Sequence, residues 1–433
     1  MIAVIIISLI TVLATAALAL FEPRLHPKHA SVRIYWIAPL AGAAILLLCG
    51  GITPAEAAAG LLAPSAVNPI KILVLFFSMT LMSVFLDEAG FFRYLASAVL
   101  RRAGGSQKKL FLLLYLAVSV LTLFTSNDIV VLTFTPFICY FAKNAEIDPV
   151  PYLFAEFVAA NTWSMGLIIG NPTNIYLAAG NGIGFAGYMK VMALPTLLGS
   201  LAPFAILWLL FHRRLQAPLR PQAEELSLSD KPTVSLGLLA LGACIVFLVL
   251  SSYLEMDMWL IAMDACVLLY MVAIPELLLR RRGMGLVTRS LHRAPYDVIP
   301  FVLSMFVLVM ALGKVGATDA LGTVILGQGE LWKSGVTSFL AANLLNNIPM
   351  SVLYSTVVTA GGTASVPALY AAVIGSNVGA FFTPMGALAG IMWMALLKQH
   401  RVELSFGRFV LYGAAISVPA LLAALGGLCI VLL

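Results

Sequence analysis

Long apolar runs recur along the whole chain, and short polar or charged stretches separate them. A helix needs about 20 apolar residues to cross the hydrocarbon core of a bilayer, and most of these runs reach that length. The composition agrees, because 61% of the 433 residues are hydrophobic and only 10% are charged. The sequence therefore predicts an all-α polytopic protein of the cell membrane, embedded in the lipid bilayer. We expect crossings at about 2–20, 34–51, 70–88, 152–180, 188–212, 233–253, 256–280, 298–313, 366–397 and 407–432.

The basic residues predict how these crossings are oriented, because cytoplasmic loops of membrane proteins are enriched in Lys and Arg. Two further apolar stretches, 109–143 and 332–360, are interpreted as re-entrant hairpins. Successive loops then alternate consistently between the cytoplasmic and the outer side of the membrane, and both termini lie outside. Two full spans in place of a hairpin would also return the chain to the side from which it entered, so both arrangements stay open. Four of the 25 Lys and Arg residues then fall outside, namely Lys71, Lys190, Lys314 and Lys333.

An internal repeat divides the chain near its middle. Residues 213–232 carry charges and Pro without an apolar period, and we interpret them as a cytoplasmic linker between halves 1–212 and 233–433. Segment 78–100 aligns without gaps on 304–326, with six identities in 23 positions. Each half has about five spans, a hairpin and a broken helix. Because each half crosses the membrane an odd number of times, the second half begins on the opposite side and is predicted to be inverted. Inverted repeats are typical of secondary transporters.

Four polar clusters interrupt the apolar runs at matching places in the halves. Two are Asn-rich hairpin tips, and two are Gly- and Pro-containing breaks in long apolar segments. Non-helical backbone at membrane depth is tolerated only where it is buried in protein or lines a watery cavity, and helix ends exposed there can bind an ion or a solute. Each motif alone could instead serve packing, since Asn also hydrogen-bonds between helices. We expect the substrate-binding residues to be Ser126, Asn127, Asn171, Thr173, Asn174, Asn346, Asn347, Ser376, Asn377 and Thr383.

Acidic residues inside apolar runs are candidates for ion coupling, because ionisable groups in a membrane are costly and usually functional. Asp128 is the leading candidate, since it lies at the first hairpin tip beside Asn127. It could cycle a proton, act as a sodium-site carboxylate, or cap the second hairpin arm. Glu156 and Asp264 are secondary candidates. Asp87 and its neighbour Glu88 are expected at a solvated cytoplasmic end.

Several other functions lack a sequence signal. The five Cys residues are scattered without a CxxC pair, which favours buried apolar roles over a metal site. No HExxH or GxSxG motif supports an enzyme, and no cofactor is expected. The distribution of the basic residues among the loops is explained by membrane orientation, so we expect no nucleic-acid partner. Without a P-loop, ATP could drive transport only through a separate cytoplasmic ATPase subunit.

Motifs over most of the chain resemble the arsenite permeases of the ArsB type, in the ion transporter superfamily. They include FLDEAGFFRYLA (85–96), SNDIVVLTFTPF (126–137), GNPTNI (170–175), RAPYDVIPFVLSM (293–305) and NNIPMSVL (346–353). The resemblance implies efflux of trivalent arsenite and antimonite, coupled to protons or assisted by a partner ATPase. The four clusters contain no Lys or Arg, which favours a neutral or cationic solute. The alternatives are a sodium- or proton-coupled carrier of a carboxylate, a sodium/proton exchanger, and a passive channel.

Overall fold

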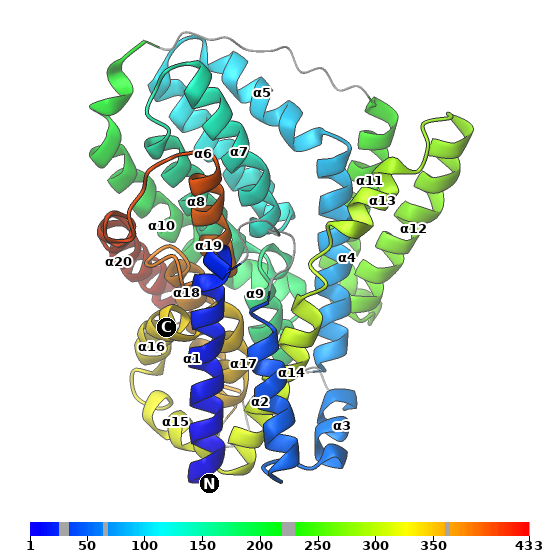
Figure 1. Ribbon diagram of the computed structural model, residues 1–433, viewed down its shortest axis with the longest axis vertical. Helices are drawn as coiled ribbons and strands as arrows, with labels where there is room; N and C mark the ends of the chain where they lie inside the picture. The colour runs from blue at the N-terminus through cyan, green and yellow to red at the C-terminus, as the bar shows by residue number, and fades with distance from the viewer. Residues whose placement is uncertain (26–33, 64–67, 219–229, 360–363, 433) are drawn as a thin grey trace.

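The computed structural model describes residues 1–25, 34–63, 68–218, 230–359 and 364–432, and every regular element in those ranges is a helix (Figure 1). One antiparallel bridge, between Ser106 and Pro218, is the remaining regular backbone pairing within them. The predicted all-α class is therefore confirmed. Most of the predicted linker, residues 219–229, lies outside the described residues.

The first half of the chain contains ten α-helices and four short 3₁₀ turns within the described ranges. They are α1 (Ile2–Leu25), α2 (Ile37–Leu48), α3 (Pro54–Leu62), α4 (Pro69–Glu88), α5 (Phe91–Ala103), α6 (Gln107–Phe124), α7 (Asn127–Asn144), α8 (Val150–Trp163), η1 (Ser164–Gly166), η2 (Ile168–Gly170), α9 (Pro172–Leu177), η3 (Ala179–Asn181), α10 (Phe185–Phe211) and η4 (Arg214–Gln216).

The second half contains ten more helices in its described part. They are α11 (Lys231–Leu254), α12 (Met258–Leu279), α13 (Gly285–His292), α14 (Val298–Lys314), α15 (Ala317–Ile325), α16 (Glu330–Leu345), α17 (Asn347–Val357), α18 (Val366–Gly379), α19 (Leu388–Gln399) and α20 (Phe406–Leu432). The order agrees with the aligned repeat. Gly90 between α4 and α5 and Gly316 between α14 and α15 both adopt positive φ, 86° and 75°, which glycine allows without strain. The inverted relation of the halves stays a prediction.

Helix length and composition agree with a membrane protein of many spans. Six described helices are long and apolar enough to cross a membrane: α4, α6, α10, α11, α12 and α20. The pair α14 and α15, bent by 81°, makes a seventh if it counts as one span. The predicted crossings at 152–180 and 366–397 instead consist of shorter helices separated by breaks, as their Gly and Pro residues indicate.

Each predicted hairpin is a pair of helices, and a hydrogen bond joins the start of its first helix to the start of the helix that follows the hairpin. In the first, Tyr152 at the start of α8 donates a hydrogen bond from its hydroxyl to Oε1 of Gln107 at the start of α6, over 2.9 Å. In the second, the Ser365 hydroxyl before α18 donates to Oε1 of Glu330 at the start of α16, over 2.7 Å. The chain therefore enters and leaves each hairpin at one level.

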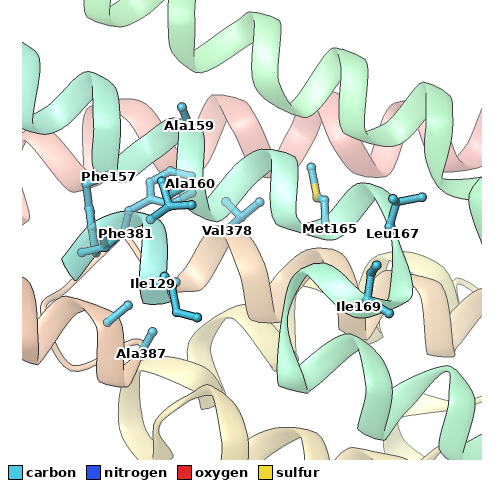
Figure 2. Close-up of a cluster of buried hydrophobic side chains, with 14 of the residues drawn as sticks. Ile129, Phe157, Ala159, Ala160, Met165, Leu167, Ile169, Val378, Phe381 and Ala387 are labelled. Atoms are coloured by element: carbon cyan, nitrogen blue, oxygen red, sulfur yellow. The ribbon is translucent and has the colours of Figure 1, made fainter. Parts of the chain in front are cut away.

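Packing brings the two halves together where α10 packs along α20, and where the pair formed by α11 and α12 stands beside α4 at one side of the molecule (Figure 1). Within the second half, α16 packs along α18. The two broken regions lie inside this assembly. Figure 2 shows apolar side chains from both breaks, including Met165, Leu167 and Val378, in one buried cluster. The polar backbone at the breaks is therefore shielded from lipid, as membrane-depth breaks require.

Candidate functional site

The first helix break follows from local sequence rules. α8 ends at Trp163, and the chain passes through two 3₁₀ turns before Asn171 adopts an extended conformation and α9 begins at Pro172. Oδ1 of Asn171 accepts a hydrogen bond from the Thr173 amide over 3.1 Å, so Asn171 is the N-cap of α9. A Cβ atom at Gly170 would collide with the Ser164 carbonyl, so only glycine allows this close approach.

Asn174 satisfies the backbone carbonyls that the first break leaves without helical partners. Its Nδ2 donates to the carbonyl of Ser164 over 2.8 Å and to that of Leu167 over 3.0 Å. Unpaired carbonyls would be costly in this fully buried region. Asn174 therefore stabilises the broken conformation itself, in addition to any contact with a solute.

The second break, between α18 and α19, is held by a residue outside the predicted set. Asn343 of α16 donates from Nδ2 to the Gly379 carbonyl over 3.1 Å. Its Oδ1 accepts from the Thr383 amide over 3.1 Å and from the Thr383 hydroxyl over 2.7 Å. The sequence signal for Asn343 is its polar side chain in the apolar run just before the second hairpin tip.

Asn377 joins the two breaks. Its Oδ1 accepts hydrogen bonds from the Ser164 hydroxyl and from Nδ2 of Asn171, both over 2.9 Å. Its Nδ2 donates to Oδ1 of Asn174 over 2.7 Å and to the Val373 carbonyl over 2.8 Å. Two donors and two acceptor positions are all that an Asn side chain offers, so Asn377 is saturated by the protein. Ser164 is a second contributor absent from the predicted set.

Both hairpin tips lie against a broken region. At the first tip, Asn127 donates from Nδ2 to Oδ1 of Asn161 on α8 over 3.2 Å. At the second, the Asn347 amide donates to the Gly386 carbonyl over 3.1 Å, and Asn346 Nδ2 donates to the Met385 carbonyl over 3.2 Å. α9 also packs against α17 and α18, so three of the four clusters adjoin directly.

Four buried oxygen atoms, one from each cluster, have no hydrogen-bond partner among the described residues. Buried polar atoms are nearly always paired, so these four oxygens are where the clusters retain binding capacity. Six predicted residues remain. Ser126 lines a cavity, and the other five use their side chains within the protein: Asn171, Asn174, Asn346, Asn377 and Thr383. The four atoms are Asn127 Oδ1, Thr173 Oγ1, Asn347 Oδ1 and Ser376 Oγ.

A cavity of about 610 Å³ reaches the first hairpin tip, where Ser126 and Asp128 contribute to its lining. The cavity extends along α4 past Thr80 and Val84, and Arg293 and Asp297 from the α13–α14 region complete its charged part. Asp128 lies in the first turn of α7, where the positive end of the helix dipole favours an acidic side chain. Asn346 at the second tip instead lines a separate, much smaller cavity.

The predicted solvation of Asp87 and Glu88 is wrong. Their side chains are only 5% and 8% exposed, and Nη1 of Arg293 lies 2.7 Å from Oδ2 of Asp87 and 2.6 Å from Oε1 of Glu88. Arg289 adds a second ion pair to Glu88, at 2.7 Å. Residues 293–297 fold back onto the end of α4. This long-range contact could not be inferred from the position of the two acids at the end of a helix.

The two secondary ion-coupling candidates lie apart from the cavity at the first tip. Glu156 on α8 is fully buried, accepts hydrogen bonds from the Thr135 hydroxyl (3.1 Å) and from Nε1 of Trp393 (3.3 Å), and forms no ion pair with a described residue. Asp264 is exposed on α12 and lines an apolar groove of about 330 Å³ between α11 and α12. No group of three His, Cys, Asp or Glu side chains suited to a metal ion occurs within the described residues.

Comparison with known proteins identifies the family. The sequence model of the citrate transporter family matches residues 16–364, more than half of the chain. The chain belongs to this family. It is therefore a membrane transporter of the ion transporter superfamily, and its polar clusters lie in a transport protein.

Relatives of this transporter match along most of its length. The arsenical pump membrane protein of Escherichia coli (strain K12) is 28% identical over 96% of both chains. The putative arsenical pump membrane protein of Bacillus subtilis (strain 168) is 26% identical over 85% of this chain and 88% of its own. A 46 kDa membrane protein of Mycobacterium leprae is 24% identical over 80% and 83%. The resemblance to arsenite permeases is confirmed, as is the multi-pass membrane location.

Proposed function

We propose that this transporter exports arsenite and antimonite as their neutral trivalent hydroxides, coupled to protons. The relatives over nearly the full chain are named arsenical pump membrane proteins, and this supports the proposed solute. The proposed binding groups are the four unpartnered oxygens of the hairpin tips and breaks, which belong to Asn127, Thr173, Asn347 and Ser376.

The observation that carries the proposal is the chemistry of the four unpartnered oxygens. Near neutral pH arsenite is mostly As(OH)₃, which offers three hydroxyl donors. Nδ2 of Asn127 donates to Asn161, whose own Nδ2 donates to the Phe157 carbonyl, so this network leaves the acceptor Oδ1 of Asn127 for a ligand. Asn347 also presents Oδ1. A carboxylate brings further acceptors and would gain little from these two amide oxygens, whereas a hydroxide solute can donate to them; the hydroxyls of Thr173 and Ser376 can bond to either solute.

The charge of the cavity at the first tip supports the same solute class. Asp128 and Asp297 line it, and its Arg293 is already paired with Asp87 and Glu88. Acidic groups therefore outnumber the Arg side chains in and around this cavity. A citrate-like anion would be repelled in such surroundings, whereas a neutral hydroxide would not.

Asp128 is the proposed coupling residue, because it is an acid in the cavity lining beside the first tip. Release of a solute against its gradient requires a coupled ion or ATP, and a carboxylate that alternately binds and releases a proton can supply the coupling. Assistance by a cytoplasmic ATPase subunit is compatible with the same solute site. The second candidate function, sodium- or proton-coupled carboxylate transport, is favoured by the description of the matched family.

A transport panel in cells that lack their own arsenical pumps tests the proposal. Cells expressing the protein are expected to tolerate more arsenite and antimonite than cells with an empty vector, and everted vesicles should accumulate arsenite when a proton gradient is imposed. Citrate, succinate and sodium uptake should stay at the vector level. Uptake of citrate or succinate without arsenite tolerance would favour the carboxylate carrier. Downhill arsenite flux without solute counterflow and without concentrative transport would indicate a passive channel.

A further inference from the structure

A second charged pocket, of about 570 Å³, lies apart from the candidate site where five segment ends meet. These are the end of α7, the start of α8, turn η4 after α10, the loop after α19 and the start of α20. All five ends are predicted to be cytoplasmic. The charged residues that line this basic pocket are Lys143, Asp148, Arg214, Arg401, Glu403 and Arg408.

Positive charge is in excess in the basic pocket. Arg214 is already held, since its Nη1 lies 3.3 Å from Oδ2 of Asp148 and its Nη2 donates to the Tyr412 hydroxyl over 3.3 Å. Lys143, Arg401 and Arg408 form no ion pair with any residue in the described ranges. Three cations therefore face a single remaining acid in one concave site, which suits an anionic ligand.

The backbone at Arg401 also departs from what its residue type favours. Arg401 has φ of 59°, in the left-handed region, where it ends α19 with hydrogen bonds from its own amide to the Lys398 carbonyl (3.1 Å) and from Val402 to Leu397 (2.8 Å). Glycine is preferred at such a helix end because a Cβ atom is strained there. A cation at this position bears a conformational cost, and its residue lines the basic pocket.

Exposed apolar residues neighbour the lining residues of the basic pocket in the sequence. Tyr140, Phe406 and Leu411 lie within two residues of the pocket-lining residues Cys139, Arg408 and Tyr412, and they are 57%, 53% and 68% exposed. Large exposed apolar side chains on a transporter helix contact acyl chains in the membrane. The pocket thus lies where the membrane surface meets the predicted cytoplasmic ends of the helices.

We propose that the basic pocket binds the phosphate of an anionic phospholipid headgroup from the cytoplasmic leaflet. Arg guanidinium groups bind phosphate oxygens in a bidentate manner, and basic pockets between helices on this side of a membrane suit such headgroups. The acyl chains would lie along the apolar surface at Tyr140 and Leu411. This site is separate from the solute site and does not depend on which solute is carried.

The test measures lipid binding to the purified full-length protein in detergent, by native mass spectrometry and by the thermal unfolding midpoint. Phosphatidylglycerol, phosphatidylcholine and inorganic phosphate are titrated separately. We expect phosphatidylglycerol to bind and raise the midpoint, and the other two to have little effect. Arg401→Gly removes one cation while suiting the left-handed backbone, so the variant should fold. It should weaken phosphatidylglycerol binding about 5-fold, and Arg401→Gly together with Arg408→Gln about 25-fold.

The chain offers a matched control in Arg281, which ends α12 with φ of 52° and lies outside the basic pocket. Arg281→Gly makes the same chemical and backbone change, and phosphatidylglycerol binding should be unchanged. An equal loss in both variants would overturn the proposal in favour of diffuse surface attraction. Equal binding of phosphatidylcholine would exclude recognition of the charge, and competition by millimolar inorganic phosphate would show a site for a soluble anion instead.

Discussion

Nδ2 of Asn171 donates a hydrogen bond over 2.9 Å to Oδ1 of Asn377, a residue 206 positions further along the chain. Asn171 caps the helix after the first break, and Asn377 lies two residues before the end of the helix that precedes the second break. A single amide pair therefore connects the two broken regions. Any motion that separates these regions during transport must break this bond, together with those from Asn377 to Ser164 and Asn174.

Asn377→Ala should lower stability, because it leaves buried groups of Ser164, Asn171 and Asn174 without partners. We expect a loss of roughly 2–4 kcal/mol, measured as a lower thermal unfolding midpoint of the detergent-solubilised protein. The neighbouring variant Ser376→Ala is the control. Its hydroxyl has no partner among the described residues, so the midpoint should hold while arsenite transport falls. Equal midpoints for the two variants would show that the Asn377 bonds are not stabilising.

Asp128→Asn should abolish proton-driven accumulation of arsenite in everted vesicles. The amide keeps the size and most hydrogen bonding of the side chain but cannot exchange a proton, whereas the proposed solute-binding oxygens are unchanged. Downhill exchange of arsenite should therefore persist. Asp264→Asn is the matched control, since Asp264 lines the separate groove between α11 and α12. Vesicles with this variant should accumulate arsenite normally. Concentrative transport by Asp128→Asn with an unaltered pH dependence would transfer the coupling role to Glu156.

Arg293→Gln should destabilise the end of α4. Asp87 and Glu88 are nearly buried, and removal of Arg293 leaves Asp87 without its cation while Glu88 keeps Arg289. The expected cost is roughly 2–3 kcal/mol, reduced from the fully buried case because Arg293 is partly exposed. The thermal unfolding midpoint should fall. Adding Asp87→Asn and Glu88→Gln to the same protein should restore most of it. No rescue by the neutral pair would mean that Arg293 acts through packing and not through charge.

Cysteine labelling in intact cells should report the predicted orientation. Cysteines are placed at exposed Ala217, within the predicted cytoplasmic linker, and at exposed Ala58 on α3, which is predicted to lie outside. The background lacks the five native cysteines, because Cys49 is exposed and would be labelled itself. A membrane-impermeant maleimide should modify position 58 and spare position 217. Ready labelling at 217 would overturn the topology and the inverted relation of the halves.

Glu56 should contribute to acid stability on the predicted outer face. Its carboxylate accepts a hydrogen bond from Lys314 Nζ over 2.7 Å and another from the Thr53 amide, and these lower its pKa from 4.5 to about 2. A depressed folded-state pKa stabilises the fold above pH 4.5, and this contribution is lost as the pH falls towards 2. Glu56→Gln should therefore show a smaller fall in unfolding midpoint between pH 5 and pH 3 than the parent. Parallel curves would contradict this.

Local rules in the sequence predicted much of the fold. Apolar length predicted the membrane helices, because a span must match the thickness of the hydrocarbon. Gly170 and Pro172 predicted the first break, since glycine favours other backbone conformations and proline cannot donate within a helix. The four polar clusters were found in the same way, as polar residues that cost too much in an apolar run to lack a role.

The tertiary structure decided which polar groups pair with one another. Asn343 and Asn161 hold a break and a hairpin tip through contacts that no local pattern encodes, and Asn377 is saturated while its neighbour Ser376 is not. Asp87 looked like a solvated helix end but is buried against Arg293, more than 200 residues away. Periodicity reports only which face of a helix is apolar. Partner choice depends on how distant helices pack, and that is decided when the two halves fold against each other.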